Sequence, residues 1–276
     1  MVTLQCNLSN RQIQAQFRKL IFGKRIFCPK CGYTKIKSRQ ERYWCPKCRS
    51  RFSLTSCTWL AGMKVPWDKL YLLLECWLKR MDLNLVVELA NISYPTAFYW
   101  YRKFRQNVPK KAFKLSSGGH YVVDETYFGF KKKGKRGRGT QGRKPVFGIY
   151  DFATGFAHAE VVSNVNEETL IPIIKEHLPL GSEIISDGWR SYENLEAMGF
   201  KHTVIDHEIE FKRTNYIESC WSHQKRNFRK MYHHCHLKNL SDYVAETTYR
   251  FCARKNPDSP LSYLQKSITL APNSLH

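Results

Sequence analysis

The sequence has few acidic residues and no long apolar run. Asp and Glu together number 23 against 45 Lys and Arg, which gives a formal net charge of +22. An imbalance of this size indicates a polyanionic partner, with nucleic acid favoured over an anionic membrane surface. The strongest apolar run, LYLLLECWL from Leu70, is short and contains Glu75. We therefore expect no membrane-spanning helix and no membrane partner.

A secretion signal and internal repeats are also missing. The first ten residues, MVTLQCNLSN, lack the charged-then-apolar pattern of a signal peptide. We therefore expect the 10 cysteines to lie in a reducing compartment, where paired cysteines hold metal more often than they form disulfides. The 276 residues are 42% hydrophobic and 14% aromatic, which is typical of folded chains with two or three domains.

Four cysteines have the spacing of a metal site. In FCPKCGYTKIKSRQERYWCPKCRSRF, Cys28 and Cys31 form one CxxC pair, and Cys45 and Cys48 form a second. Four thiolates suit tetrahedral Zn²⁺, and the intervening residues alternate enough to form the β-hairpins of a zinc ribbon. Two disulfides or four free thiols are the alternative. Basic residues surround the ribbon, so it either contacts phosphate or is purely structural with a solvated basic face.

A second module reads as helices. Residues 66–107 form a helical run, in which NLVVELA, the break NIS and YPTAFYWYRKFRQ follow one another. Ser93 is a good helix cap and Pro95 fits the first turn, so the pattern resembles a helix-turn-helix. A plain packing module is the alternative. The side chains expected inside are Ala97, Trp100 and Phe104. Those expected to face the DNA major groove are Thr96, Tyr99, Arg102 and Lys103.

From residue 120 onward, strands and helices alternate. The expected order is strand, strand, strand, helix, strand, helix, strand, helix, with WRSYENLEAMG (189–199) as one of the helices. This order predicts an α/β domain, a mixed sheet flanked by helices. The domain boundaries predicted for the chain are a helical lead-in (1–24), a zinc ribbon (25–57), a helical DNA-binding module (58–108), a catalytic domain (118–256) and a tail (257–276).

Three carboxylates stand out in the α/β region. Asp124 lies within an apolar strand, where an ionised carboxylate is costly without a positive partner. Asp187 ends a later strand, and Glu218 lies on a long helix whose other charges are positive. If the first and fourth strands are neighbours, the three acids meet and can hold Mg²⁺ (or Mn²⁺), since hard cations prefer oxygen ligands. The alternative is that each is an ordinary structural residue.

Together these motifs resemble the Merlin-type DDE transposases and their bacterial insertion-sequence relatives. The resemblance is carried by the ribbon, the helical module, VVDETYFG, GIYDFATG, IISDGWRSYENLEAMGFKH and NYIESCWSHQKR. It implies a ribonuclease H-like catalytic domain in which Asp124, Asp187 and Glu218 are catalytic. It also implies metal-dependent cleavage of DNA at transposon ends and joining of the 3′-hydroxyl to target DNA. The implied partners are terminal inverted repeats and target DNA, bound by a homodimer or larger assembly.

Two basic segments are expected to grip DNA. The first, KKKGKRGRGTQGRK (131–144), cannot form a core and would lie beside Asp124; a solvated loop is the alternative. The second follows Glu218 on its helix. The first segment is compatible with a nuclear-localisation signal, so the nucleus is expected in a eukaryote, and the cytoplasm or nucleoid in a bacterium. The predicted DNA-binding residues here are Lys131, Lys132, Lys133, Lys135, Arg136, Arg138, Lys225, Arg226 and Arg229.

Two rival functions remain open at this stage. One is a ribonuclease H-type nuclease that cuts without strand transfer. The other is a domesticated DNA-binding protein that keeps the fold but has lost the chemistry. The segment EIEFKRT (208–214) before the Glu218 motif is shorter than is usual in the family, which favours the second rival, whereas the presence of all three acids opposes it.

Overall fold

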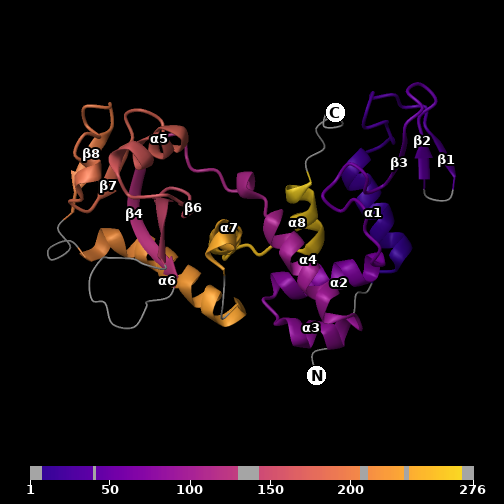
Figure 1. Ribbon diagram of the computed structural model, residues 1–276. Coiled ribbons are helices and arrows are strands. Elements are labelled where there is room, and N and C mark those ends of the chain that lie inside the picture. The colour runs from indigo at the N-terminus through magenta and orange to yellow at the C-terminus, as the bar shows by residue number, and fades with distance from the viewer. Residues whose placement is uncertain (1–7, 40–41, 130–142, 206–210, 233–235, 269–276) are drawn as a thin grey trace. The chain divides into compact units, whose positions relative to one another are not determined.

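The computed structural model describes residues 8–39, 42–129, 143–205, 211–232 and 236–268, with the side chains of 211–214 left out (Figure 1). The chain divides into two compact units. The first comprises residues 1–109 together with 258–276, and the second comprises residues 110–257. Among the helices in the described ranges, none combines the length and the apolar character needed to cross a membrane.

The first unit begins with a helix and a small sheet. α1 (Asn10–Phe22) starts at Ser9, which forms a capping box with Gln12. Three short antiparallel strands follow in the order β1-β2-β3, which confirms the predicted ribbon hairpins. Their bounds are Lys37–Arg39 for β1, Arg42–Trp44 for β2 and Arg51–Ser53 for β3.

The helical module has the predicted turn between its second and third helices. α3 ends at Asn91, which adopts a left-handed conformation with φ 46°, and α4 is capped by Ser93. Ala97, Trp100 and Phe104 are buried, as their spacing predicts, and they pack α4 into this unit. The helices are α2 (Trp67–Leu78), α3 (Leu83–Ala90) and α4 (Tyr94–Gln106).

The C-terminal segment, for which the sequence predicts a separate tail, belongs to the first unit. α8 (Pro260–Ser267) places Tyr263 in the core, where its hydroxyl donates to the carbonyl of Phe104 at 2.5 Å. The ring of Tyr263 packs edge-on against Trp77 with centroids 5.3 Å apart. This return was not predicted, because eight residues of mixed character carry no periodicity strong enough to identify a core helix.

Tyr263→Ala is expected to destabilise the first unit by about 3–5 kcal/mol, since it removes a large buried ring and leaves a cavity. Tyr263→Phe, which loses only the hydrogen bond, should cost about 0.5–1.5 kcal/mol. Denaturant unfolding of both variants measures the difference. Equal and negligible effects would contradict the packing of α8 described here.

The second unit contains a five-stranded mixed sheet in the order β6-β5-β4-β7-β8. β4, β5 and β6 are antiparallel, whereas β7 runs parallel to β4, and β8 parallel to β7. The first and fourth strands of the domain are therefore neighbours, which is the condition under which the three acids can meet, and the fold is ribonuclease H-like. The strands are β4 (His120–Gly129), β5 (Arg143–Asp151), β6 (Ala157–Val161), β7 (Glu183–Ser186) and β8 (Lys201–Val204).

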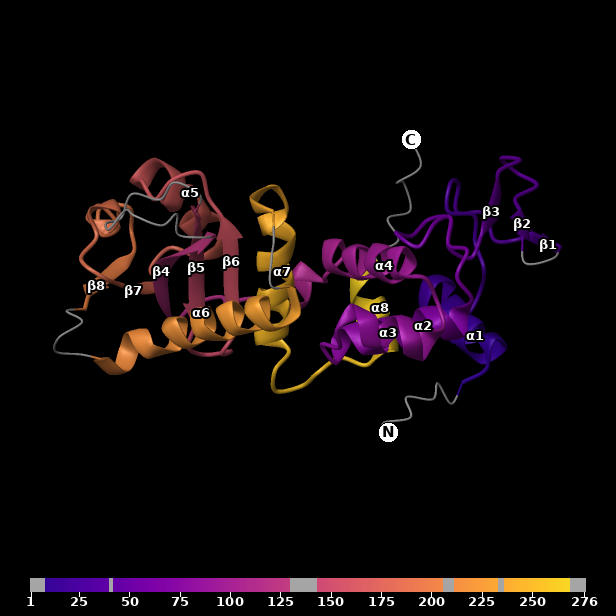
Figure 2. The same ribbon diagram turned by 60° about the horizontal axis from the view of Figure 1, so that its bottom comes forward.

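Helices cover both faces of this sheet. α6 and α7 pack on one face through a cluster that includes Ile217, Trp221 and Val244, and Figure 2 shows α6 running across the strands. α5 packs on the other face through Leu170 and Ile174. The helical elements are η1 (Lys110–Ala112), α5 (Glu167–His177), η2 (Arg190–Tyr192), α6 (Phe211–Tyr232), η3 (Leu237–Asn239) and α7 (Leu240–Cys252).

The prediction of a helix over residues 189–199 is wrong. The structure has only the short 3₁₀ helix η2 there, followed by turns. The hydroxyl of Ser191 donates to the carbonyl of Val165 at 2.6 Å, and Asn194 donates to the carboxylate of Glu167 at 2.9 Å. A helix of 11 residues is only marginally stable by itself. Hydrogen bonds to distant residues therefore determine the conformation of this segment.

Candidate active site and cysteine cluster

The four predicted cysteines come together in the first unit. The Sγ atoms of Cys28, Cys31, Cys45 and Cys48 all lie within 4.8 Å of one another. Cys28 and Cys48 are 3.5 Å apart, and Cys31 and Cys45 are 3.6 Å apart. Ligands 2.3 Å from a tetrahedral zinc ion would be about 3.8 Å apart. The cluster thus fits a zinc ribbon.

The local backbone and a serine shape the cysteine cluster. The turns after Cys28 and Cys45 close with Gly32 and Arg49 at positive φ, so each CxxC pair wraps around a common point. Ser50 lies 3.0 Å from the Cys48 sulfur. A hydrogen bond from this hydroxyl, together with the Ser50 amide, lowers the pKa of Cys48 to about 6. Thiolate is the form that ligates metal, so Ser50 favours metal binding by Cys48.

In the second unit, two of the predicted acids belong to neighbouring parallel strands, Asp124 within β4 and Asp187 directly after β7. β4 and β7 pair with His120 opposite Glu183 and Val122 opposite Ile185. Continuing this register by two residues brings Asp124 opposite Asp187, which directly follows β7. Adjacent strands lie about 4.8 Å apart, so the two carboxylates start from neighbouring backbone positions. This is the edge at which α/β domains place their sites.

The third acid lies on α6, which packs over β4. The indole N–H of Trp221 donates to Oδ2 of Asp124 at 2.8 Å. Glu218 precedes Trp221 by three residues and so shares its helix face. Burial raises the pKa of Asp124 to about 6; the Trp221 bond opposes this rise, and the charges of Asp187 and Glu218 add to it. Asp187 and Glu218 are thus each close enough to Asp124 to act on it electrostatically.

The three carboxylates do not converge on a single point. Within the described ranges, the four cysteines are the one set of three or more ligand atoms that all lie within 4.8 Å of one another. Within the described ranges, the three carboxylates are thus a looser set than the four thiols.

The opposite face of β4 holds a second half-buried acid. Glu125 points away from Asp124, as strand alternation predicts, and its Oε1 accepts a hydrogen bond from the hydroxyl of Tyr192. Burial raises the pKa of Glu125 to about 7; Tyr192 opposes the rise, and Asp124 and Asp187 contribute to it. The sequence carries no signal for this pair, because the two residues lie on separate elements with no shared motif.

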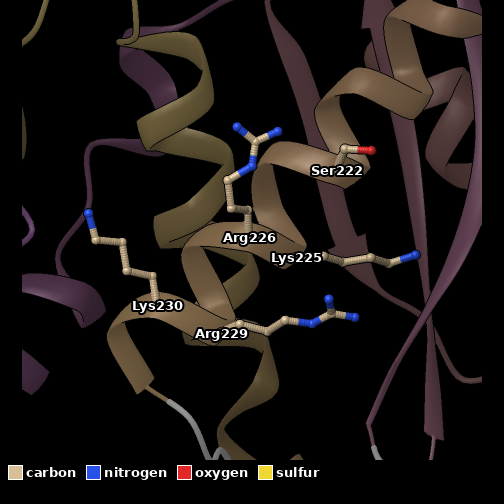
Figure 3. A pocket seen from close by; sticks show the side chains of 5 residues that line it. All are labelled: Ser222, Lys225, Arg226, Arg229 and Lys230. Atoms are coloured by element: carbon tan, nitrogen blue, oxygen red, sulfur yellow. The ribbon is translucent and has the colours of Figure 1, made fainter.

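A basic hollow of about 590 Å³ lies on the C-terminal half of α6. Figure 3 shows Lys225 and Arg229 extending to the same side of the helix. Burial lowers the pKa of Lys225; Asp124 opposes this effect, and Arg143 and Arg229 add to it. Lys225 is therefore close to both the acid cluster and other cations. The hollow is lined by Ser222, Lys225, Arg226, Arg229 and Lys230.

The other predicted DNA-binding residues fall in two places. On α4, Tyr99 and Arg102 are exposed, and the Lys103 ammonium lies 5.7 Å from the centre of the Tyr99 ring. This face is thus open to a ligand in the first unit. The remaining predictions lie outside the described residues, as do positions 208–210 of the short segment before Glu218. They are Lys131, Lys132, Lys133, Lys135, Arg136 and Arg138.

Comparison with known proteins identifies the family. The ISXO2-like transposase domain matches residues 117–252. An uncharacterized transposase-like protein of Haemophilus influenzae is 35% identical over 95 residues, which cover 33% of this chain and 76% of that protein. The chain belongs to the ISXO2-like transposase family. This membership confirms the resemblance to DDE transposases and their bacterial insertion-sequence relatives.

Two solved structures are more distant neighbours of this ISXO2-like chain. The HTLV-2 integrase catalytic core domain in complex with magnesium is 12% identical, with a TM-score of 0.33, over 50% of this chain and 87% of that one. The catalytic core domain of BIV integrase is 13% identical, with a TM-score of 0.35, over 54% of this chain and 95% of that one.

Proposed function

We propose that this chain is a DNA transposase that cleaves phosphodiesters at transposon ends and joins the freed 3′-hydroxyl to target DNA. The observation that supports this most is the β4–β7 register, which brings Asp124 beside Asp187 under a helix that carries Glu218. In a chain with a net charge of +22, an acidic cluster next to a basic hollow suits metal-assisted chemistry on a polyanion.

Asp124, Asp187 and Glu218 would hold Mg²⁺ or Mn²⁺ through carboxylate oxygens, which are the ligands that these ions prefer. When bound, such cations activate the attacking oxygen and stabilise the leaving oxygen of an in-line displacement. The protein's own contribution would be to hold one acid on β4, one directly after the neighbouring β7 and the third on a packed helix. Rigid elements of this kind hold ligands more accurately than loops do.

The cysteine cluster would hold Zn²⁺ with a structural role. All four ligands come from the protein, which is typical of structural rather than catalytic zinc. The ribbon strands are three residues each and bury few side chains, so metal binding would supply most of their stability. Together with Tyr99, Arg102 and Lys103 of α4, the ribbon would recognise the terminal repeats.

The basic hollow on α6 would hold the DNA backbone next to the cut. Arg226→Ala combined with Arg229→Ala should weaken DNA binding and reduce the slope of log affinity against log salt by roughly 2, since each lost phosphate contact lowers it by about 0.9. The matched control is Lys175→Ala with Lys201→Ala, which removes two exposed charges from α5 and β8. Fluorescence anisotropy over a salt series measures both. Equal slopes in the two double variants would contradict this role.

Joining two transposon ends in one reaction requires that both be bound at once, so the active form is expected to be a dimer or a larger assembly. The chain should be tested with DNA from both flanks of its own coding region, a supercoiled target plasmid, and Mg²⁺. Cleavage followed by joined products supports the transposase. Cleavage without joined products indicates a nuclease, and binding without cleavage indicates a domesticated DNA-binding protein; either result overturns the proposal.

A further inference from the structure

Trp221 makes a contact that ordinary core packing does not require. Its side chain is 5% exposed, and its indole N–H is directed at Oδ2 of Asp124 at 2.8 Å. Most of a tryptophan's burial energy comes from its ring, which could pack on a sheet in many orientations. Here the orientation places the one polar atom of the ring on a carboxylate of the proposed site.

The sheet leaves room for the indole ring of Trp221 at Gly148. Gly148 lies opposite Asp124 in the antiparallel pairing of β4 and β5. A Cβ at this position would lie 2.3 Å from Cη2 and 2.6 Å from Cζ2 of Trp221, far inside van der Waals contact. Several glycines in the described ranges have a positive φ, but Gly148 does not. Its backbone conformation therefore does not require glycine. Close approach of the indole is the remaining reason for the missing side chain.

We propose that Trp221 is a positioning residue for Asp124, and that Gly148 provides the space that this role needs. The inference rests on the proposed function, because that function makes Asp124 a metal ligand. The indole N–H anchors one oxygen of the carboxylate and so fixes the orientation of the whole group. Glu218 lies one helical turn before Trp221, so the same helix face both supplies a ligand and orients another. Groups that orient metal ligands in this way typically change metal affinity or activity by about 10–100-fold when mutated.

Trp221→Phe tests the role directly, since it keeps a ring in the core and removes the N–H donor. We expect its affinity for Mn²⁺, measured by electron paramagnetic resonance on the DNA-free chain, to fall by about 10–100-fold. Trp59→Phe is the matched control, because it removes an indole N–H that donates to Ser267 at 3.3 Å in the other unit. It should bind Mn²⁺ as the native chain does. Both measurements are made well below the unfolding temperature of each variant, with the fold checked by NMR.

Gly148→Ala provides a second route to the same effect. The added methyl group would displace the indole, so Mn²⁺ affinity should fall as in Trp221→Phe. In the double variant the smaller Phe ring leaves room for the methyl group. The double variant should therefore bind Mn²⁺ no more weakly than Trp221→Phe alone, which gives a non-additive cycle.

The outcomes separate this inference from the proposed function. If the native chain binds no Mn²⁺, or binds it equally well after Asp187→Asn, the metal site itself is wrong. If the native chain binds Mn²⁺ through Asp187 but Trp221→Phe binds it with unchanged affinity, only the positioning role is overturned. A loss of affinity in Trp221→Phe that the Trp59→Phe control shares equally would also overturn it.

Discussion

Asp187→Asn is expected to reduce DNA cleavage by on the order of 10³-fold or more, while DNA binding stays at the native level. Losing a single electrostatic stabiliser of the transition state typically costs 10²–10³-fold, and a lost metal ligand removes more charge than that. Asn has nearly the same shape, and its Oδ1 can still accept the hydrogen bond that the Trp189 amide gives to Asp187 at 3.2 Å. The fold should therefore persist. Cleavage is measured as single-turnover rates on end-bearing DNA, and binding by anisotropy.

The matched control for Asp187→Asn is Glu193→Gln. Glu193 is an exposed acid on the same segment, so the substitution removes the same charge six positions away without touching the site. Cleavage by this variant should be native. An Asp187→Asn chain that cuts DNA at the native rate would show that the acid directly after β7 takes no part in the chemistry.

Cys45→Ser is expected to abolish zinc binding and unfold the ribbon. Cys45 has no exposed surface, and its sulfur lies 3.6 Å from that of Cys31. Structural zinc sites of this type contribute about 10–16 kcal/mol at pH 7, far more than three short strands can supply by packing. Zinc content is measured by atomic emission, and ribbon folding by proteolysis between residues 25 and 57. Recognition of the transposon ends should be lost, whereas the second unit should stay folded.

Cys57→Ser is the matched control for the ribbon, because it makes the same atomic change at a half-buried thiol outside the cluster. It should keep zinc and the native proteolysis pattern. A Cys45→Ser chain with a native ribbon, or a native chain free of zinc after purification without chelators, would contradict the structural role of the metal.

Much of the fold and of the candidate sites can be predicted from the sequence, because the relevant patterns lie within short stretches of the chain. The CxxC spacing predicts which four cysteines come together, and the order of strands and helices predicts a mixed sheet flanked by helices. Strand alternation also separates Asp124 from Glu125 without any structure. For the same reason, the spacing of Ala97, Trp100 and Phe104 gives the inner face of α4.

Other features depend on contacts between distant residues and so leave no local pattern. α8 returns to the first unit because Tyr263 fits between Trp77 and Phe104, a match of shapes across more than 150 positions. The segment 189–199 has a helical composition, yet bonds to the loop at Val165 hold it in turns. The need for glycine at position 148 likewise appears only once α6 is packed on β5.

The central claim is that Asp124, Asp187 and Glu218 jointly bind the divalent ions that act on DNA. Anomalous diffraction from crystals of the full chain soaked in Mn²⁺ tests it most directly. The account predicts a peak within coordination distance of both Asp124 and Asp187, with Glu218 ligating the same ion or a neighbouring one, and loss of that density in Asp187→Asn crystals. Ordered carboxylates with no manganese between Asp124 and Asp187, or a Glu218 that ligates no ion in a manganese-loaded site, would contradict it.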